Sequence, residues 1–175
     1  PITSGVISVA TKLKLIARVG VGLDSVDLVA ARRNNVSVSY TPDAPSKAVA
    51  DLTIGLMFAL LRSTQLSNLS IRNKLWKRYF GRRLSESIIG VIGAGRIGKL
   101  VIRDLTSLGC ENVLVNDTDS SIIEKLSNQY SGLTICAKED IYREADVITM
   151  HVPLSRNTRN MIRMDELMRM KKEAV

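Results

Sequence analysis

The stretch GVIGAGRIGK, residues 90–99, carries three glycines in the spacing G-x-G-x-x-G. Because glycine is common, such a spacing alone is weak evidence of function. The context is more specific. The apolar run SIIGVIG (87–93) is typical of a buried strand, and KLVIRDLTSLG (99–109) repeats apolar residues at helical spacing. A glycine turn between a buried strand and a helix is the arrangement that holds the pyrophosphate of a dinucleotide.

Each residue of this turn has an expected role. Gly93 allows the tight turn, Gly95 lets the backbone approach a pyrophosphate, and Gly98 lets the helix pack closely on the strand. The backbone amides of Arg96 and Ile97, at the start of the helix, are expected to face the phosphates. The turn therefore predicts a site for a dinucleotide.

An acidic residue follows the glycine turn at the sequence distance that is typical of dinucleotide-binding sites. Asp117 lies 19 residues after Gly98, at the end of the next predicted strand, and can accept hydrogen bonds from the adenosine ribose hydroxyls. A 2′-phosphate about 4 Å from this carboxylate would meet a repulsion of about 4 kcal/mol at an effective dielectric constant of 20. Thr118 and Asp119 follow, and neither is a cation. We expect NAD rather than NADP, and the alternative for Asp117 is a turn or capping residue.

Strands and helices alternate along the rest of the chain, which predicts an α/β fold with a doubly wound parallel sheet. After the glycine turn, strands are expected over 112–117, 133–137 and 146–153, and helices over 120–130, 138–145 and 163–172. Ala174 and Val175 could begin a further strand. Before the turn, strands over 13–19 and 36–42 flank a helix over 24–34, capped by Asp24 or Ser25, and an apolar helix capped by Ser46 covers 46–62. That helix is apolar on nearly all sides and should be buried on several faces.

Composition limits the alternatives. The formal net charge is +8, but the basic residues are spread out, apart from a denser patch at 72–83, and only 4% of residues are aromatic, so a nucleic-acid partner is not expected. No apolar run is long enough for a membrane span. Cys110 and Cys136 have no metal-ligand spacing, so we expect no metal and a reduced, cytoplasmic protein. The first residue is Pro1, and we expect an internal piece of a longer protein.

Four stretches, in order, resemble the D-isomer-specific 2-hydroxyacid dehydrogenase family, which includes the phosphoglycerate dehydrogenases. They are RVGVGLDSVD (18–27), YTPDAPSKAVADLTIGLM (40–57), IIGVIGAGRIGK (88–99) and ADVITMHVPLSRNTRNMI (145–162). The resemblance implies a Rossmann-type NAD domain over 85–175 that is incomplete at its C-terminus, part of a flavodoxin-like substrate domain over 1–45, and connecting and dimerisation helices over 46–84. It also implies a homodimer through the 46–62 region.

The same resemblance assigns further residues. Val21 and Gly22 match the loop that holds the carboxylate of a small 2-hydroxy or 2-keto acid. Cofactor contacts are implied for Thr53, His151, Val152, Pro153, Asn157 and Thr158. His151 is the only histidine, but the family's catalytic histidine lies further toward the C-terminus. We therefore expect the catalytic residues beyond Val175, and none within this chain.

Three functions remain open from the sequence. The first is the NAD-binding portion of an oxidoreductase that transfers hydride between NAD and a D-2-hydroxy acid, with 3-phosphoglycerate as one candidate; this chain alone would be inactive. The second is a non-catalytic NAD-sensing regulatory module of the same fold, which needs the same glycine turn. The third is a basic nucleic-acid-binding domain. A lack of affinity for DNA and RNA at physiological salt would exclude it.

Overall fold

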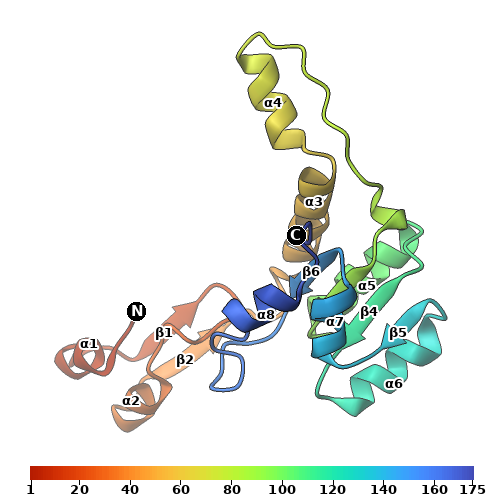
Figure 1. The fold of residues 1–175 in the computed structure, drawn as a ribbon. Coiled ribbons are helices and arrows are strands. Elements are labelled where there is room, and N and C mark those ends of the chain that lie inside the picture. The colour runs from red at the N-terminus through yellow and green to blue at the C-terminus, as the bar shows by residue number, and fades with distance from the viewer. The chain divides into compact units, whose positions relative to one another are not determined.

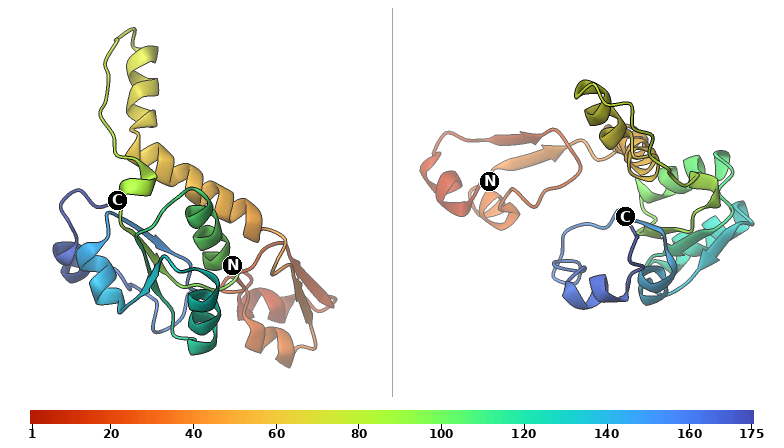
Figure 2. Two further views of the ribbon diagram at one scale, coloured as in Figure 1. Left: turned by 90° about the vertical axis from the view of Figure 1, so that its right-hand side faces the viewer. Right: turned by 45° about the horizontal axis from the view of Figure 1, so that its top comes forward.

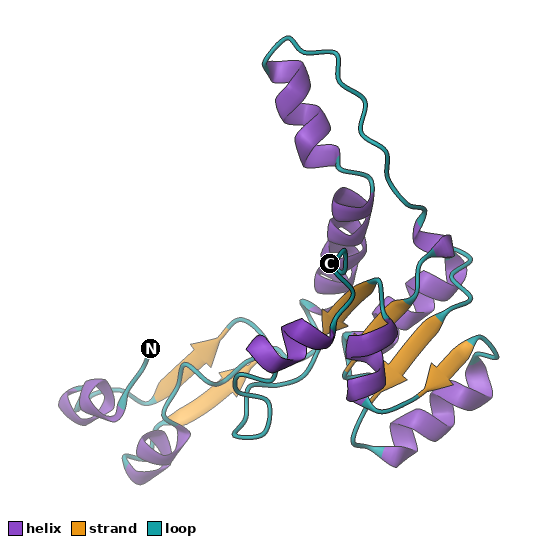
Figure 3. Cartoon of the chain, viewed as in Figure 1, coloured by secondary structure: helices purple, strands orange, loops and turns teal.

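The computed structural model describes residues 1–175, which form two compact units, Pro1–Ser46 and Lys47–Val175. The first unit contains α1 (Ser4–Val9), β1 (Leu15–Arg18), α2 (Leu28–Arg33) and β2 (Ser37–Tyr40), and its two strands are parallel (Figures 1 and 3). The expected strands and the helix between them are confirmed. A small core holds the unit together, made of Ile7, Ile16, Val26, Ala30, Ala31 and Val36.

The start of α2 differs from the prediction. The helix is capped by Asp27, whose carboxylate accepts a hydrogen bond from Ala30 N–H at 2.8 Å, and not by Asp24 or Ser25. The reason is tertiary. Ile2 pairs with the segment before the helix: its N–H donates to Ser25 O, and its carbonyl accepts from Asp27 N–H. Val26 N–H also donates to Leu23 O at 3.0 Å, so residues 23–26 form a turn that ends in this bridge, and the helix begins later.

The second unit contains a four-stranded sheet in which all neighbours are parallel. Its strands are β3 (Ile89–Ile92), β4 (Val113–Asn116), β5 (Leu133–Ile135) and β6 (Val147–Met150), in the order β5-β4-β3-β6. The chain moves outward from β3 to β5 and then returns to the other side of β3. This reversal is the doubly wound topology, and the predicted fold class is confirmed.

Helices cover both faces of this sheet (Figure 2). On one face lie α5 (Gly98–Ser107) and α6 (Ser120–Gln129), and on the other lies α7 (Lys138–Glu144). Successive residues of β3 divide between the layers: Ile89 and Val91 join the core beneath α5, whereas Ile92 joins the core beneath α7. Because all four residues of β3 are buried, this strand forms the centre of the unit.

The long apolar helix α3 (Ser46–Leu61) packs on the α5 face through Ala50, Met57 and Leu61. Its remaining faces are exposed, so the expected burial on several faces is not met within this chain. Ser46 is the first helical residue, and its hydroxyl donates to Pro42 O, so it does not act as the predicted cap. Then follow α4 (Thr64–Arg72) and an extended segment at 73–83, which reach away from the sheet (Figure 1).

No single helix is long and apolar enough to cross a membrane. Only α3 and α4 together, with a bend of 65° between them, have the length and composition for it.

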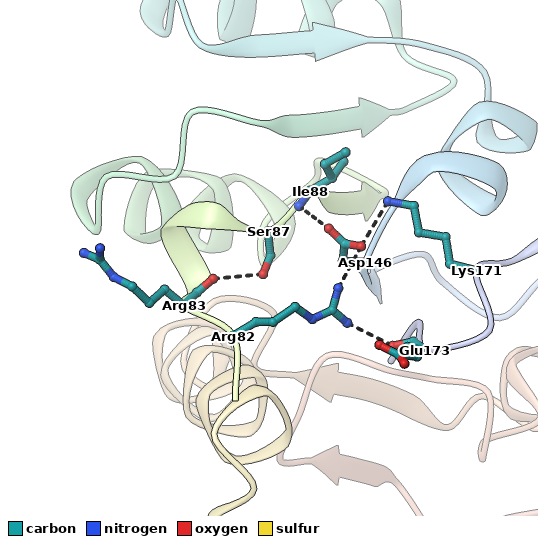
Figure 4. A network of polar contacts seen from close by, with 7 residues as sticks. All are labelled: Arg82, Arg83, Ser87, Ile88, Asp146, Lys171 and Glu173. Carbon is teal, nitrogen blue, oxygen red and sulfur yellow. Dashed lines mark hydrogen bonds and ion pairs between the residues drawn. The ribbon is translucent and has the colours of Figure 1, made fainter. Parts of the chain in front are cut away.

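An ionic cluster closes the amino-terminal edge of the sheet (Figure 4). Asp146, just before β6, is 9% exposed and accepts hydrogen bonds from Ile88 N–H at 2.8 Å and from Arg82 and Lys171, each at 3.0 Å. Lys171 follows α8 (Met164–Arg169). Val175 pairs with the outer side of β6 through Asp146 O and Ile148 N–H, as expected for the start of a further strand.

Candidate dinucleotide site

The opposite, carboxyl-terminal edge of the sheet gathers most of the predicted site residues. The order of the strands reverses between β3 and β6, and open α/β sheets bind their ligands at the carboxyl edge beside such a reversal. The glycine turn follows β3, Asp117 follows β4, and His151 follows β6. Three neighbouring strands thus deliver the three predicted groups to one edge.

Two of the glycines are required by close packing. Gly93 has a φ of 90°, and a Cβ on it would lie 2.8 Å from His151 O and from Val152 Cγ1. A Cβ on Gly98 would lie 1.9 Å from Gly93 O, closer than real atoms approach. The turn and the first residues after β6 therefore touch backbone to backbone, which brings His151 and Val152 against the turn.

Gly95 differs from both, because a Cβ there would meet nothing within 4 Å. The backbone N–H groups of Gly95 and Ile97 find no acceptor within the chain. They stand at the start of α5, a ten-residue helix whose dipole favours an anion at this end. Open space above a glycine, beside unsatisfied donors, suits the pyrophosphate of a dinucleotide.

Asp117 is joined directly to the turn. Its Oδ2 accepts a hydrogen bond from Ala94 N–H at 2.7 Å, and its Oδ1 accepts one from Asp119 N–H at 2.9 Å. Helix capping falls to Asp119, which accepts from Ser121 N–H at the start of α6. A carboxylate has about four acceptor positions, so two remain on Asp117 for ribose hydroxyls.

His151 is half-buried, and its Nε2 lies 2.9 Å from Thr149 Oγ1. The backbone N–H of His151 donates to Ile92 O at 2.8 Å, which continues the pairing of β6 with β3. Burial lowers the pKa of the imidazole below its ordinary value, which favours the neutral form. The ring is thus a positioned, uncharged group beside the glycine turn.

The remaining predicted residues are less closely tied to this edge. Pro153 O accepts from the Thr158 hydroxyl, and Ser155 N–H donates to Thr158 Oγ1 at 2.7 Å, so the loop after β6 is closed by Thr158. Asn157 lies exposed in the same loop. The hydroxyl of Thr53 donates to Val49 O within α3.

Val21 and Gly22 belong to the first unit, in the loop after β1, where the preceding Gly20 has a φ of 138°. The N–H of Gly20 donates to Thr41 Oγ1 at 2.9 Å, which ties this loop to the end of β2. Both predicted substrate contacts therefore stand at the carboxyl end of a parallel pair.

Two contacts at the site were not predicted. Ala94 N–H binds Asp117, and the side-chain amide of Asn116 donates to Cys136 O at 2.8 Å, which joins the ends of β4 and β5. The only available signal was the position of Asn116 and Asp117 at the end of a predicted strand. That position places their side chains near neighbouring strand ends without identifying the partner.

Comparison with known proteins agrees with this geometry. Residues 54–175 match the family described as "D-isomer specific 2-hydroxyacid dehydrogenase, NAD binding domain". The chain is 36% identical to D-3-phosphoglycerate dehydrogenase of Methanocaldococcus jannaschii, over 99% of this chain and 33% of that protein. It is 31% identical to hydroxypyruvate reductase of Thermotoga maritima, over 97% of this chain and 54% of that protein.

Solved structures give the same result. D-lactate dehydrogenase of Aquifex aeolicus, complexed with NAD and lactic acid, superposes with a TM-score of 0.81 at 27% identity, over 97% of this chain and 50% of that one. The chain thus spans between a third and about half of the length of these relatives. The glycine turn, the acid after β4 and the matched sequence agree: this chain belongs to the D-isomer-specific 2-hydroxyacid dehydrogenases and contains their NAD-binding domain.

Proposed function

We propose that this chain is the cofactor-binding portion of an NAD-dependent oxidoreductase acting on a small D-2-hydroxy acid. The observation that carries the proposal is the carboxyl edge of the sheet, where unsatisfied amides at Gly95 and Ile97 stand beside the carboxylate of Asp117. The relatives named above are dehydrogenases and reductases of 2-hydroxy and 2-keto acids, and they support the same reaction class. The phosphoglycerate dehydrogenase among them makes 3-phosphoglycerate the first substrate to test.

The chain's own residues bind and orient in this proposal. The amides of Gly95, Arg96 and Ile97 hold the pyrophosphate, and Asp117 accepts hydrogen bonds from the ribose hydroxyls. Bound NAD supplies hydride transfer at its nicotinamide ring. His151, Val152 and Pro153, with Asn157 and Thr158, form the wall of the cofactor crevice after β6, and Thr53 contributes from α3.

In this proposal the first unit contributes to substrate binding, because Val21 and Gly22 offer backbone amides to the substrate carboxylate. No proton-transfer role is assigned to His151, because its ring is engaged by Thr149 and burial disfavours its charged form. We propose that the groups that clamp the substrate and move its hydroxyl proton lie outside these 175 residues, so that this chain binds NAD without turnover.

Calorimetric titration of the purified chain with NAD and with NADP tests the proposal. We expect NAD to bind and NADP to bind at least tenfold more weakly, because a 2′-phosphate would face Asp117 and Asp119. No reduction of NAD should follow the addition of 3-phosphoglycerate. Equal affinity for both nucleotides would contradict the role of Asp117, and measurable turnover would contradict the absence of catalytic residues.

We also propose that the chain forms a homodimer through α3, α4 and the segment 73–83. Large apolar side chains are exposed along this region; among them Leu52, Leu56, Leu60, Trp76 and Phe80 are each more than 50% exposed. Large apolar side chains that are exposed in such number along one region support an interface there. Residues 72–83 also carry the densest basic patch of the sequence, which keeps the nucleic-acid alternative testable by affinity measurements at physiological salt.

Light scattering coupled to gel filtration measures the oligomeric state directly. We expect a dimer for the wild-type chain and a monomer for the double substitution Leu56→Glu and Leu60→Glu. The same change at Val6 and Val9, which are exposed in α1 of the first unit, serves as the control and should leave the dimer intact. A wild-type monomer at micromolar concentration would contradict the proposal.

A further inference from the structure

The second unit has another hollow, between α5 and α6. Its volume of about 630 Å³ lies within the range of roughly 300–1,000 Å³ typical of small-molecule sites. It begins at Gly95 and Arg96 and continues between the two helices, which lie on the same face of the sheet (Figure 2). Neither Asp117 nor His151 lines it. The hollow therefore adjoins the glycine turn but is separate from the proposed ribose and nicotinamide contacts.

The floor of this hollow is apolar. Leu126 is buried, and Leu100, Ile122 and Tyr130 are half-buried against the core beneath α5 and α6. These side chains are fixed by their packing, so a ligand would meet a floor that is already formed. Covering such a surface removes apolar area from water, which favours binding.

The rim is cationic. Lys99 and Arg103 on α5 and Lys125 on α6 line the hollow together with Arg96, and no carboxylate lines it. Arg103 is neutralised by Asp104 at 2.7 Å, whereas neither Lys99 nor Lys125 has a carboxylate within 4 Å, and the charge of Lys125 acts on Asp119 only from a greater distance. These two ammonium groups stand on facing helices at the edge of an apolar floor.

One polar group of the lining can also recognise an acceptor. The phenolic oxygen of Tyr130 accepts a hydrogen bond from Gln129 Nε2 at 3.0 Å. This contact leaves the phenolic proton for an acceptor on a ligand. The hollow thus combines two unpaired ammonium groups, a hydroxyl donor and an apolar floor.

We propose that the hollow between α5 and α6 binds a small amphipathic anion, a flat or short apolar body that carries a single acidic head group. The body covers Leu126 and Tyr130, and the head group lies between Lys99 and Lys125. A head group near Gly95 and Arg96 also stands close to the proposed pyrophosphate position. Binding of this ligand and binding of NAD should therefore weaken each other. Because coupling is reciprocal, NAD lowers the affinity for this ligand by the same factor. Only this coupling rests on the proposed function.

Anilinonaphthalene sulfonate is a suitable probe, followed by amide chemical shifts in NMR titrations so that binding at α5 and α6 is separated from binding at the exposed surface of α3. We expect shifts at both helices in the absence of NAD. The double substitution Lys99→Glu and Lys125→Glu should weaken this binding at least tenfold. The matched pair Lys12→Glu and Lys14→Glu changes the net charge equally in the first unit and should leave it unchanged.

Two further titrations complete the test. Inorganic phosphate, which lacks an apolar body, should bind at least tenfold more weakly than the probe. Saturating NAD should lower the affinity for the probe at least threefold. Equal affinity in all three proteins, or phosphate binding as tightly as the probe, would overturn the site. Probe binding that NAD does not change would overturn the coupling, and NAD binding measured alone reports separately on the proposed function.

Discussion

Asp117 and Asp146 adjoin the two strands that flank β3, but they stand at opposite edges of the sheet. Asp117 follows β4 at the carboxyl edge, is half-buried and accepts hydrogen bonds from two backbone amides. Asp146 precedes β6 at the amino edge, is buried, and accepts from one backbone amide and from the cations of Arg82 and Lys171 (Figure 4). The same residue type therefore sits in two different electrostatic settings.

This difference separates a binding group from a structural one. The charge of Asp146 is neutralised by the chain itself, so its carboxylate holds the connecting segment, β3 and the C-terminal residues together. The charge of Asp117 has no cationic partner, and part of its acceptor capacity remains for a ligand. A carboxylate of this kind attracts ribose hydroxyls and repels a second anion, which is how we expect it to select NAD.

The largest effect should come from Asp146→Ala. This change leaves Ile88 N–H without its acceptor and the two cations without their carboxylate, so we expect unfolding free energy to fall by about 3 kcal/mol. Urea denaturation measures the loss, with Glu124→Ala on the exposed side of α6 as the control. NAD affinity of the folded protein should not change. A loss below about 1 kcal/mol would show that the cluster contributes little.

Asp117→Ala should act mainly on binding. Losing charged hydrogen bonds to the ribose should raise the Kd for NAD about 20-fold, equivalent to about 1.8 kcal/mol, and cost less in stability than the change at Asp146. Calorimetry measures the affinity. Asp117→Asn is the matched control: it removes the charge, so the preference for NAD over NADP should shrink. Unchanged NAD affinity in the alanine variant would refute the ribose assignment.

A third difference concerns acid. Burial alone would raise the pKa of Asp146, but the hydrogen bond from Ile88 N–H and the charges of Lys171 and Arg82 together hold that pKa below its ordinary value. A carboxyl with a lowered folded-state pKa stabilises the protein above its unfolded pKa of roughly 3.9, and this contribution disappears as the pH falls through the folded value.

Urea denaturation at a series of pH values below about 5 tests this. We expect the acid-dependent loss of stability to become shallower in Asp146→Asn, which cannot titrate. The part of this loss that belongs to Asp146, which is the difference between wild type and Asp146→Asn, should be smaller than the loss caused by Asp146→Ala, because a protonated carboxyl still accepts hydrogen bonds. Identical slopes in wild type and Asp146→Asn would mean that other carboxylates account for the whole acid dependence.

The sequence predicted the sheet well because each strand and helix after Ser87 has a local apolar pattern. The strand, glycine turn and helix at 87–109 were predicted together, and the helix ends just before Gly109, which has a φ of 79°. The six-residue helix α1 was not predicted: it contains Gly5 and two exposed valines, and its flanking Thr3 makes no capping hydrogen bond. Short helices of this kind depend on tertiary contacts rather than on propensity.

The contacts at the candidate site also depend on tertiary structure, so local sequence did not predict them. Spacing alone identified Asp117, but its bond to Ala94 joins residues 23 positions apart, and the bonds of Asp146 to Arg82 and Lys171 join residues 64 and 25 positions apart. No local pattern encodes such pairs, because they form only when the strands align. The cofactor roles of Thr53, Asn157 and Thr158 likewise remain predictions from the resemblance.

The smallest effect should come from removing one of the two cations of Asp146. The side chain of Lys171 is 39% exposed and that of Arg82 is 44% exposed, so solvent screens each ion pair. We expect Lys171→Met to cost about 0.5–1 kcal/mol, because Arg82 still neutralises the carboxylate. Losing both cations leaves a buried charge unpaired, so Arg82→Met with Lys171→Met should cost more than the sum of the single changes. Additive losses in urea denaturation would mean that Asp146 is hydrated when its partners are removed, and its setting would then resemble that of Asp117.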